Sequence, residues 1–395
     1  MRVSLSTKFV AAGFAAVLAF VSLVQPALAQ LGQVETPARQ MIMVDYDTGA
    51  VLFEKNADEL MPPSSMSKLM TAFMVFEELA AGRLRLEDTL PVSEKAWRIQ
   101  GSKMFVPIGE RVKVEDLLRG VIVQSGNDAC IVLAEGIAGS EERFAEMMTE
   151  RARELGMSRS VFKNASGWPD PEHVMTAREL AVLARLIIER FPQYYHYYSE
   201  KEFTYGIDGA TKKPITQGNR NPLLYKGGGA DGLKTGHTEA AGYGLTASAK
   251  RGDRRLILVV NGLKSMAERS REAERLMELG FSQFENYKVF SAGAVVDEAD
   301  VWLGTLARMP LVIERNLTVT MPRQTRGNVK VVVSYDNPIP APIVKGTPVA
   351  TLRVEGRDGP ITEVPLVAGA DAGQLGFTGR ISAAISYLLW GSGQK

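Results

Sequence analysis

The feature that most constrains this chain is a helix start at residues 62–68, Pro-Pro-Ser-Ser-Met-Ser-Lys, together with the apolar run that follows it. Prolines favour the turn before a helix or its first positions, Ser64 is a suitable N-cap, and Gly82 supplies a stop. Large apolar side chains occupy more than one face of this predicted helix, at Leu69, Met70, Phe73, Met74, Phe76 and Leu79. A surface helix has one apolar stripe, so this pattern predicts a central helix enclosed by other layers.

Ser65 and Lys68 stand three residues apart at this helix start, which places their side chains on one face at hydrogen-bonding distance. A serine hydroxyl attacks only when a base takes its proton, and a lysine can act as that base only when neutral. Burial, the amino end of a helix and a second cation each lower the pKa of a lysine. The alternative is a capped core helix, because Ser-x-x-Lys also occurs at Ser160 and Lys163 without any supporting pattern.

Residues 1–29 are predicted to be a secretory signal peptide. Arg2 and Lys8 precede an apolar stretch at 9–24, and Ala-Leu-Ala at 27–29 fits the small-x-small cleavage pattern. The apolar stretch is short for a membrane span and is interrupted by serine and glycine, which argues against a retained anchor. We therefore expect the mature protein to begin near Gln30, outside the cytoplasm.

The remainder of the 395-residue chain is long enough for two domains. A net charge of +1 gives no electrostatic reason to expect a nucleic acid partner. The single Cys130 excludes an intramolecular disulfide framework. The three histidines, His173, His196 and His237, lack metal-ligand spacing, so a metal site is not expected.

A second informative stretch is Ser125-Gly126-Asn127, which separates one helical pattern, ending near residue 123, from another at 129–137. A tight turn between two helices lets a hydroxyl and an amide point into a cleft instead of competing with backbone hydrogen bonds. The alternative interpretation is a turn that only caps the second helix.

A third stretch, Lys234-Thr235-Gly236-His237, follows a glycine-rich segment and precedes predicted strands at 243–249 and 256–260. The tripeptide Lys-Thr-Gly is predicted to begin a strand, and its glycine would let another backbone approach closely. A peptide-like substrate could then add to this edge as a further strand. The alternative is a solvated strand end that carries a basic residue.

Taken in this order, the three stretches resemble those of the penicillin-binding serine enzymes, and most closely the low-molecular-mass D-alanyl-D-alanine carboxypeptidases. The resemblance covers essentially the whole mature chain and is closest at residues 124–130, 234–238 and 242–243. It implies an α+β fold of the penicillin-binding and β-lactamase-like serine transpeptidase type, with an antiparallel sheet and a helical subdomain. A small all-β domain and a C-terminal amphipathic helix would follow.

The resemblance implies catalytic roles for four residues. Ser65 would be the acylated nucleophile and Lys68 its general base. Ser125 would relay protons, and Asn127 would hold Lys68 or the substrate amide. The oxyanion hole would use the backbone N–H groups of Ser65 and His237.

The same resemblance implies a substrate-binding set: Lys234, Thr235, Gly236, His237, Arg271 and Arg220. Lys234 would be the second cation that the pKa argument requires. Thr235 would bind the terminal carboxylate of the substrate, with Arg271 as its charge partner.

The implied reaction cleaves the bond between the last two D-alanines of a peptidoglycan stem pentapeptide through an acyl-enzyme on Ser65, without a cofactor. A β-lactam would acylate the same serine. Three alternatives stay open. The first is a serine β-lactamase, although Ser-Asp-Asn and a Glu-x-x-Leu-Asn loop, usual in one class of these enzymes, are not found in this chain. The others are an endopeptidase of the same superfamily, against which the long C-terminal extension argues, and a penicillin-sensing or wall-binding protein that acylates without turnover.

The predicted catalytic domain spans residues 30–282, and beyond it the apolar period changes to two. Leu317, Val319 and Met321 alternate with threonines, and Leu352 and Val354 alternate with charged residues. Short strands separated by Gly, Pro and Asn indicate a small β-sandwich or barrel over residues 283–378. No constellation in it suggests chemistry, so we expect a spacer or docking module.

The C-terminal segment 379–395 is predicted to be an amphipathic helix. Its apolar side is formed by Ile381, Ala384, Ile385, Leu388 and Leu389, and Trp390 suits a lipid interface. The segment is too short to span a bilayer. The resemblance implies a membrane-surface helix and hence a periplasmic enzyme attached peripherally to the outer face of the cytoplasmic membrane. The alternative is a helix that packs on the β domain.

We predict that the mature protein sediments with lipid vesicles, whereas a form ending at Thr378 stays in solution and keeps its activity. Four large apolar side chains, at roughly 1.5 to 3 kcal/mol each, can sustain reversible binding. Equal sedimentation of the two forms would refute the membrane helix, and loss of folding on truncation would favour packing on the β domain.

Overall fold

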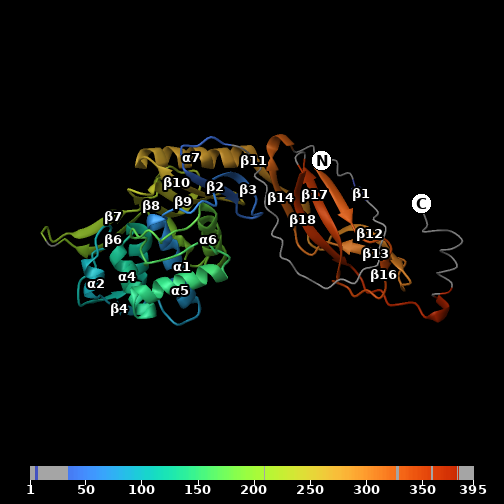
Figure 1. Ribbon diagram of the computed structural model, residues 1–395, viewed down its shortest axis with the longest axis horizontal. Coiled ribbons are helices and arrows are strands. Elements are labelled where there is room, and N and C mark those ends of the chain that lie inside the picture. Colours follow the sequence, from blue (N-terminus) through green and yellow to red (C-terminus); the bar gives the residue numbers. More distant parts are fainter. Residues whose placement is uncertain are drawn as a thin grey trace. The chain divides into compact units, whose positions relative to one another are not determined.

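The computed structural model describes residues 5–7, 34–208, 210–325, 329–356, 359–379 and 381. It divides the chain into two compact units, one spanning Gln30–Ser282 and the other containing the residues from Gln283 onward (Figure 1). The predicted signal peptide lies outside the described residues except for Leu5–Thr7. The predicted C-terminal helix lies outside them except for Gly379 and Ile381.

A five-stranded antiparallel sheet organises the first unit, in the order β3-β2-β10-β9-β8. Strands β2 and β3 pair directly as a hairpin on either side of the Gly49 turn, as expected for two short apolar runs that flank Asp-Thr-Gly. Strand β8 forms one edge of the sheet. The strands are β2 Gln40–Asp45, β3 Val51–Lys55, β8 Ala230–Thr238, β9 Gly242–Arg251 and β10 Arg254–Leu263.

Helices cover both faces of this sheet (Figure 1). Helix α7, Met266–Gln283, lies along one face, where Gly280 leaves room for Met43 and Leu256 of the sheet. On the other face the larger helices are α1 Lys68–Ala80, α4 Asn127–Ala138, α5 Glu141–Glu154 and α6 Ala177–Arg190. Shorter helices complete this unit: η1 Ser64–Ser67, α2 Glu94–Arg98, α3 Val114–Arg119, η2 Gly120–Gln124, η3 Tyr195–Ser199 and η4 Pro222–Tyr225. Two small hairpins, β4 Thr89–Pro91 with β5 Arg111–Lys113 and β6 Glu202–Ile207 with β7 Pro214–Gly218, flank them.

Helix α1 is the central helix that its sequence predicts. Every residue from Lys68 to Phe76 is buried, so the helix is enclosed on all sides. Near its C-terminal end Phe73 packs edge-on against Phe191, with ring centroids 5.2 Å apart, and Phe76 stacks on Tyr194 at the same distance. Such aromatic pairs add to the free energy gained from apolar burial. The helix ends where Gly82 adopts a left-handed conformation, as expected.

Two local expectations need correction. The Ser64 side chain does not cap α1, because the chain enters that helix through the 3-10 turn η1 and Ser64 Oγ contacts Thr238 instead. Lys234, Thr235 and Gly236 do not begin a strand but lie in the middle of β8, because the pairing with β9 already starts at Ala230.

The second unit is rich in strands, as the period-two pattern predicts. A seven-stranded sheet has the order β1-β15-β17-β18-β13-β12-β16, and β11 pairs with β14 in a separate two-stranded sheet. Buried Leu317, Val319, Met321, Leu352 and Val354 contribute to its core. The strands are β1 Leu5–Thr7, β11 Phe284–Phe290, β12 Val295–Trp302, β13 Arg308–Val312, β14 Leu317–Pro322, β15 Lys330–Ser334, β16 Ile339–Pro340, β17 Pro348–Gly356 and β18 Gly359–Ala368, with the short helix η5 Arg323–Thr325.

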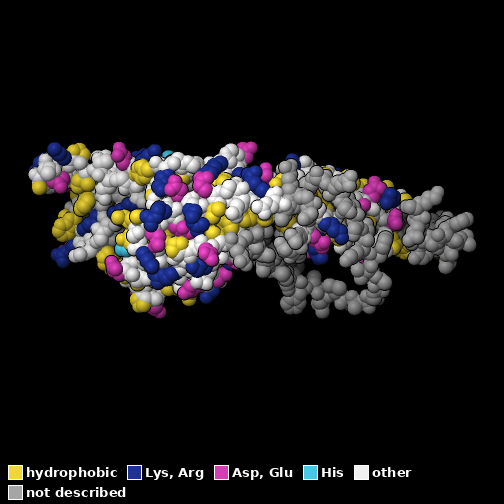
Figure 2. Space-filling model, turned by 90° about the horizontal axis from the view of Figure 1, so that it is seen from above, with side chains coloured by type: hydrophobic (Ala, Val, Ile, Leu, Met, Phe, Trp, Pro, Cys, Tyr) yellow, Lys and Arg dark blue, Asp and Glu magenta, His cyan; other side chains and the backbone are white. Residues whose placement is uncertain are grey.

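In the described part of the chain, charges of both signs are mixed on the surface (Figure 2) and no helix is suited to cross a membrane. In Figure 2 basic and acidic side chains are interspersed over the visible face of the first unit, which agrees with the small net charge. Among the described helices, none has both the length and the apolar character needed to cross a membrane.

Candidate active site

Ser65 and Lys68 meet at the junction of η1 and α1. Residues three apart in a 3-10 turn lie one above the other, so the turn brings the two side chains together. Lys68 Nζ lies 3.0 Å from Ser65 Oγ, and the Lys68 side chain is almost completely buried, at 1% exposure. The predicted contact between a hydroxyl and an amine is therefore present in the fold.

Two further oxygen atoms surround the amino group of Lys68. Asn127 Oδ1 lies 2.7 Å from Nζ and the backbone carbonyl of Ser166 lies 2.5 Å from it. The Asn127 amide is oriented by its own Nδ2, which donates to the carbonyl of Gln100 at 2.8 Å. Lys68 thus contacts three acceptors, which come from its own turn, from the start of α4 and from the loop after α5.

Sequence reasoning missed Ser166, although the surrounding Gly/Pro-rich segment is recognisable as a loop. Every residue has a backbone carbonyl, so the residue type does not indicate that this carbonyl belongs to the site. The only local clue is Asn164, whose Oδ1 accepts hydrogen bonds from the N–H groups of Ser166 and Trp168. These bonds fold the loop tightly and direct its carbonyl groups toward α1.

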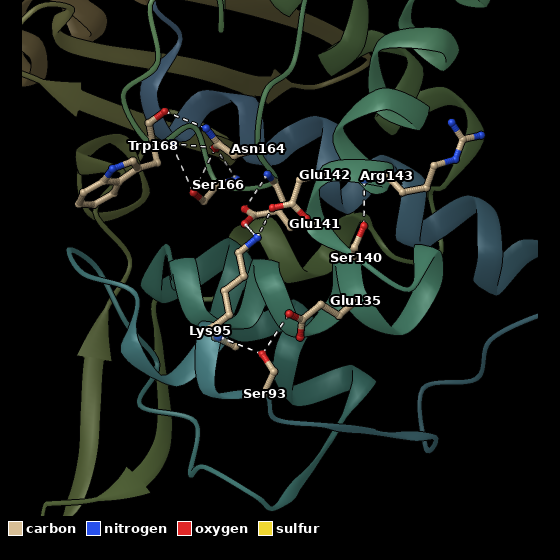
Figure 3. Close-up of polar contacts among 12 residues, drawn as sticks. Ser93, Lys95, Glu135, Ser140, Glu141, Glu142, Arg143, Asn164, Ser166 and Trp168 are labelled. Atoms are coloured by element: carbon tan, nitrogen blue, oxygen red, sulfur yellow. Dashed lines mark hydrogen bonds and ion pairs between the residues drawn. The ribbon is translucent and has the colours of Figure 1, made fainter.

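An ion pair between the exposed Lys95 and the buried Glu141 also holds this loop in place, as Figure 3 shows. Glu141 Oε1, at the start of α5, accepts a hydrogen bond from the backbone N–H of Ala165, and its Oε2 lies 2.8 Å from Lys95 Nζ. Thr71 of α1 donates to the Ala165 carbonyl at 2.5 Å. The loop is therefore tied to both α5 and α1, which positions the Ser166 carbonyl at Lys68.

Burial lowers the pKa of Lys68 to about 8, and the positive charge of Arg220 acts in the same direction. Cys130, Asp128 and Glu141 oppose that shift. Lys234 is also buried, and burial followed by repulsion from Lys68 and Arg220 places its pKa well below the ordinary value. Because burial lowers the pKa of Lys68, and the charge of Lys68 in turn disfavours the charged form of Lys234, a neutral lysine is accessible near neutral pH.

Strand β8 runs beside the nucleophile turn and forms one wall of the site. Lys234 and Thr235 are buried, whereas His237 is exposed and stacks on Tyr243 with ring centroids 3.9 Å apart. A Cβ atom at Gly236 would lie 2.8 Å from the carbonyl oxygen of Pro63. The predicted close backbone approach therefore exists, but the neighbouring backbone belongs to the turn that carries the nucleophile.

The structure does not bring Arg271 to this wall. Arg271 is exposed on α7, whereas Arg269 is 5% exposed and has its guanidinium carbon 5.8 Å from the ring centroid of Tyr243. Its Nη2 donates to the Arg220 carbonyl at 3.3 Å, and its Nε has no hydrogen-bond partner in the described part of the chain. The helical period explains the correction, because the buried face of α7 contains residues 269, 272, 273 and 276, and residue 271 points elsewhere.

Arg220 lies near the same end of the site. Its Nη1 donates to Ser102 Oγ at 2.7 Å, and partial burial lowers the pKa of its guanidinium group. The charge of Arg220 lowers the pKa of both Lys68 and Lys234. Arg220 therefore acts on the electrostatics of the site in addition to offering a cationic group.

Ser125 ends the π-helical turn η2 with a left-handed backbone, φ 62°. This conformation is uncommon for a residue other than glycine and occurs often at functional sites. The Ser125 hydroxyl is buried and has no hydrogen-bond partner among the described residues. Next to it, the carboxylate of Asp128 accepts hydrogen bonds from the N–H groups of Met104, Phe105 and Val106, which holds the adjoining loop.

The chain is similar in sequence to D-alanyl-D-alanine carboxypeptidases. Residues 27–265 match the family model described as D-alanyl-D-alanine carboxypeptidase, and residues 284–374 match the C-terminal domain of penicillin-binding protein 5. The D-alanyl-D-alanine carboxypeptidase DacC of Escherichia coli K12 is 39% identical over 381 residues, which are 93% of this chain and 94% of the relative. DacA of the same organism is 33% identical over 358 residues, 89% of this chain and 87% of the relative.

Solved structures of penicillin-binding proteins have the same fold as this chain. Penicillin binding protein 5 from Haemophilus influenzae superposes with a TM-score of 0.79 at 34% identity, covering 86% of this chain and 99% of that structure. Penicillin binding protein 6B from Escherichia coli gives a TM-score of 0.69 at 34% identity, with coverage of 87% and 98%.

We predict that Gly236→Ala slows the reaction of Ser65 with a labelled penicillin by about tenfold or more and destabilises the protein by about 1–3 kcal/mol. The added Cβ would push β8 away from the Pro63 carbonyl. Gly218→Ala in strand β7 is the matched control, because there the nearest atom to a Cβ is the Tyr225 hydroxyl at 3.4 Å. Similar rates and thermal midpoints for the two variants would contradict the packing argument.

We also predict that the rate of acylation by penicillin rises with pH, with a midpoint near the Lys68 pKa of about 8. Only the neutral amine can take the Ser65 proton, so the rate should fall about tenfold per pH unit well below the midpoint. Lys68→Arg keeps the charge but cannot deprotonate, and should lose at least about a hundredfold. A variant that keeps half the wild-type rate would show that Lys68 has a structural role only.

Proposed function

This chain belongs to the D-alanyl-D-alanine carboxypeptidase family, and from that premise we propose that Ser65 and Lys68 are its acylation pair. The enzyme is a serine hydrolase of the penicillin-binding type, which removes the terminal D-alanine of a peptidoglycan stem pentapeptide. The observation that carries the assignment of roles is the buried amino group of Lys68, which contacts Ser65 Oγ and has a lowered pKa.

In the proposed acylation step, neutral Lys68 takes the proton of Ser65 as the hydroxyl oxygen attacks the carbonyl between the two D-alanines. The backbone N–H groups of Ser65 and His237 would stabilise the oxyanion. When the tetrahedral intermediate collapses, the peptide C–N bond breaks and the leaving amine of D-alanine needs a proton. Ser125 would deliver that proton from Lys68, which suits a buried hydroxyl that has no other partner among the described residues.

The terminal carboxylate of the substrate would bind at the opposite end of the cleft from the acyl chain. Thr235 offers a hydroxyl from β8, and Arg269 offers a buried guanidinium whose Nε is without a partner in the described chain. Charge-assisted hydrogen bonds of this kind are stronger than neutral ones. We therefore assign to Arg269 the role that the sequence comparison assigned to Arg271.

Hydrolysis of the acyl-enzyme needs a water molecule, whose proton Lys68 or Ser125 would accept as the water oxygen attacks the ester. Ser65 then regains its hydrogen and the shortened peptide leaves. With a β-lactam, opening the ring acylates the same serine while the leaving nitrogen stays covalently attached. That attached group would hinder attack by water, which accounts for slow release.

The surroundings of Lys68 favour a carboxypeptidase over a β-lactamase that uses a glutamate to activate water. Among the described residues, the hydrogen-bond partners of Lys68 Nζ are Ser65, Asn127 and Ser166, and none of them is acidic. The nearby Glu141 is engaged by Lys95 and the Ala165 backbone. A penicillin sensor that acylates without turnover remains distinguishable by experiment, because it would release no D-alanine.

We further propose that a signal peptide is removed after Ala29, that the enzyme works in the periplasm and that residues 379–395 attach it to the outer face of the cytoplasmic membrane. The exposed apolar side chains of Phe377, at 79%, and Ile381, at 46%, support a surface that is completed by lipid. Ile381 lies in helical backbone near the beginning of the predicted amphipathic segment, and Phe377 lies in helical backbone just before it.

The proposal predicts that labelled penicillin attaches covalently to Ser65. Intact-mass measurement should find one adduct on the wild-type protein and none on Ser65→Ala, and the variant should release no D-alanine from a synthetic tripeptide ending in D-Ala-D-Ala. Ser160→Ala, in the chain's second Ser-x-x-Lys, is the matched control and should keep the adduct. An adduct of wild-type extent on Ser65→Ala would refute the assignment.

A further inference from the structure

Strand β15 of the second unit loses one of its two neighbours when the signal peptide is removed. On one side β15 pairs with β17 along its whole length, antiparallel and without a shift in register. On the other side its neighbour in the described chain is β1, Leu5–Thr7, which belongs to the predicted signal peptide. Removal of the signal peptide, as proposed above, therefore exposes the outer backbone N–H and C=O groups of β15.

Three consecutive valines form the middle of this edge. Val331 and Val333 point into the core of the unit, whereas Val332 points to the opposite face, as the alternation of a strand requires. Exposed edges in soluble proteins are usually protected by a proline, a bulge or a charged side chain in the middle of the strand. Strand β15 has no proline and no bulge, and its charged residue, Lys330, stands at its first position. The edge is therefore suited to accept another strand.

Strand β1 shows how an added strand lies on this edge. Leu5–Thr7 runs parallel to β15 and pairs in register with residues 331–333, so that Leu5 lies opposite Val331. Opposite residues of such a pair point to the same face of the sheet. In an added strand of this direction, the third residue after the one opposite Val331 therefore lies opposite Ser334. Strand addition derives affinity from backbone hydrogen bonds and specificity from alternate side chains.

A hollow of about 450 Å³ lies where β15 ends. Ser334 of β15, Thr351 of β17 and Pro365 of β18 are direct cross-strand neighbours, and all three line it. The two residues that follow β15, Tyr335 and Asp336, line it as well. A side chain that lies opposite Ser334 on an added strand would therefore be next to this hollow.

The hollow has negatively charged surroundings. The Asp336 carboxylate is exposed and forms no hydrogen bond or ion pair within the described ranges of the chain. Burial and then the negative charges of Asp297 and Asp300 raise the pKa of the Tyr335 hydroxyl, and Arg308 opposes this shift. A basic side chain is the natural complement of such a site, because it would pair with a carboxylate that has no other partner there.

We propose that, in the mature protein, the edge of β15 binds an extended segment of a partner protein as an added parallel strand. The partner segment has an apolar residue opposite Val331, as Leu5 is in β1, and a lysine or arginine opposite Ser334 that pairs with Asp336. The second unit is then a docking module that recruits the enzyme to another protein. This inference rests on the removal of residues 1–29 stated under the proposed function, and it is independent of the catalytic roles assigned there.

A labelled peptide of residues 3–10 tests the edge, because it contains the segment that forms β1 and has Lys8 at the position that would lie opposite Ser334. It is added to the mature protein that begins at Gln30, and binding is followed by fluorescence anisotropy. We expect saturable binding and slower backbone hydrogen exchange at residues 330–334. The same peptide with Lys8→Ala should bind about tenfold more weakly, which corresponds to one good polar contact.

Variants of the protein separate the strand edge from the charge. Val332→Lys puts a charge in the middle of the edge without entering the core, and should weaken binding of the peptide about tenfold or more. Val344→Lys adds the same charge at a side chain that is 66% exposed, and should bind normally. Asp336→Asn should abolish the advantage of the Lys8 peptide over its alanine form, whereas Glu314→Gln removes another exposed carboxylate of this unit and should keep it. If Val332→Lys fails to fold, the Asp336 comparison still decides the proposal.

Absence of binding, or binding that leaves exchange at residues 330–334 unchanged, would overturn the proposal. So would equal affinity for the two peptides, or a mature protein whose mass still includes residues 1–29. Sedimentation that shows a dimer, together with slow exchange at residues 330–334 before any peptide is added, would assign the edge to a second copy instead. Failure of the proposed catalytic function gives a different result, namely peptide binding by a protein that releases no D-alanine.

Discussion

The buried amino group of Lys68 is the constraint on which the rest of the catalytic unit depends. An ammonium ion taken out of water without partners costs several kcal/mol, so the fold must either surround it with oxygen atoms or let it lose its proton. This protein does both, because Ser65, Asn127 and Ser166 supply acceptors while burial brings the pKa to about 8. A group held at this balance can accept and return a proton near neutral pH.

The close packing around the nucleophile turn follows from that constraint. The acceptors come from three separate segments, and they keep their distances only if those segments cannot slide. Gly236 and Gly167 allow β8 and the Ser166 loop to approach the backbone of residues 63 and 64 more closely than any side chain would permit. The Glu141 carboxylate fixes the loop from the other side. The catalytic geometry is therefore maintained mainly by backbone contacts.

Several elements could be predicted from the sequence because their causes are local. The β2–β3 hairpin, the enclosed helix α1 and the turn at Ser125 follow from turn residues and apolar period, and all three are present. Expectations failed where a neighbour far along the chain decided the outcome. Ser64 contacts Thr238 instead of capping a helix, and the length of β8 is set by its pairing with β9.

The sequence by itself determined which chemical groups are available and how Ser65 and Lys68 are spaced, since both depend only on residue type and helical geometry. The tertiary structure decided which groups surround them. Ser166 contacts Lys68 through a backbone carbonyl 98 positions away. Arg269 rather than Arg271 packs against Tyr243 of β9 because of the way α7 lies on the sheet, and His173 lines a cavity next to Ser64 because a loop folds over η1. Such contacts depend on how distant segments pack, and no local pattern records that.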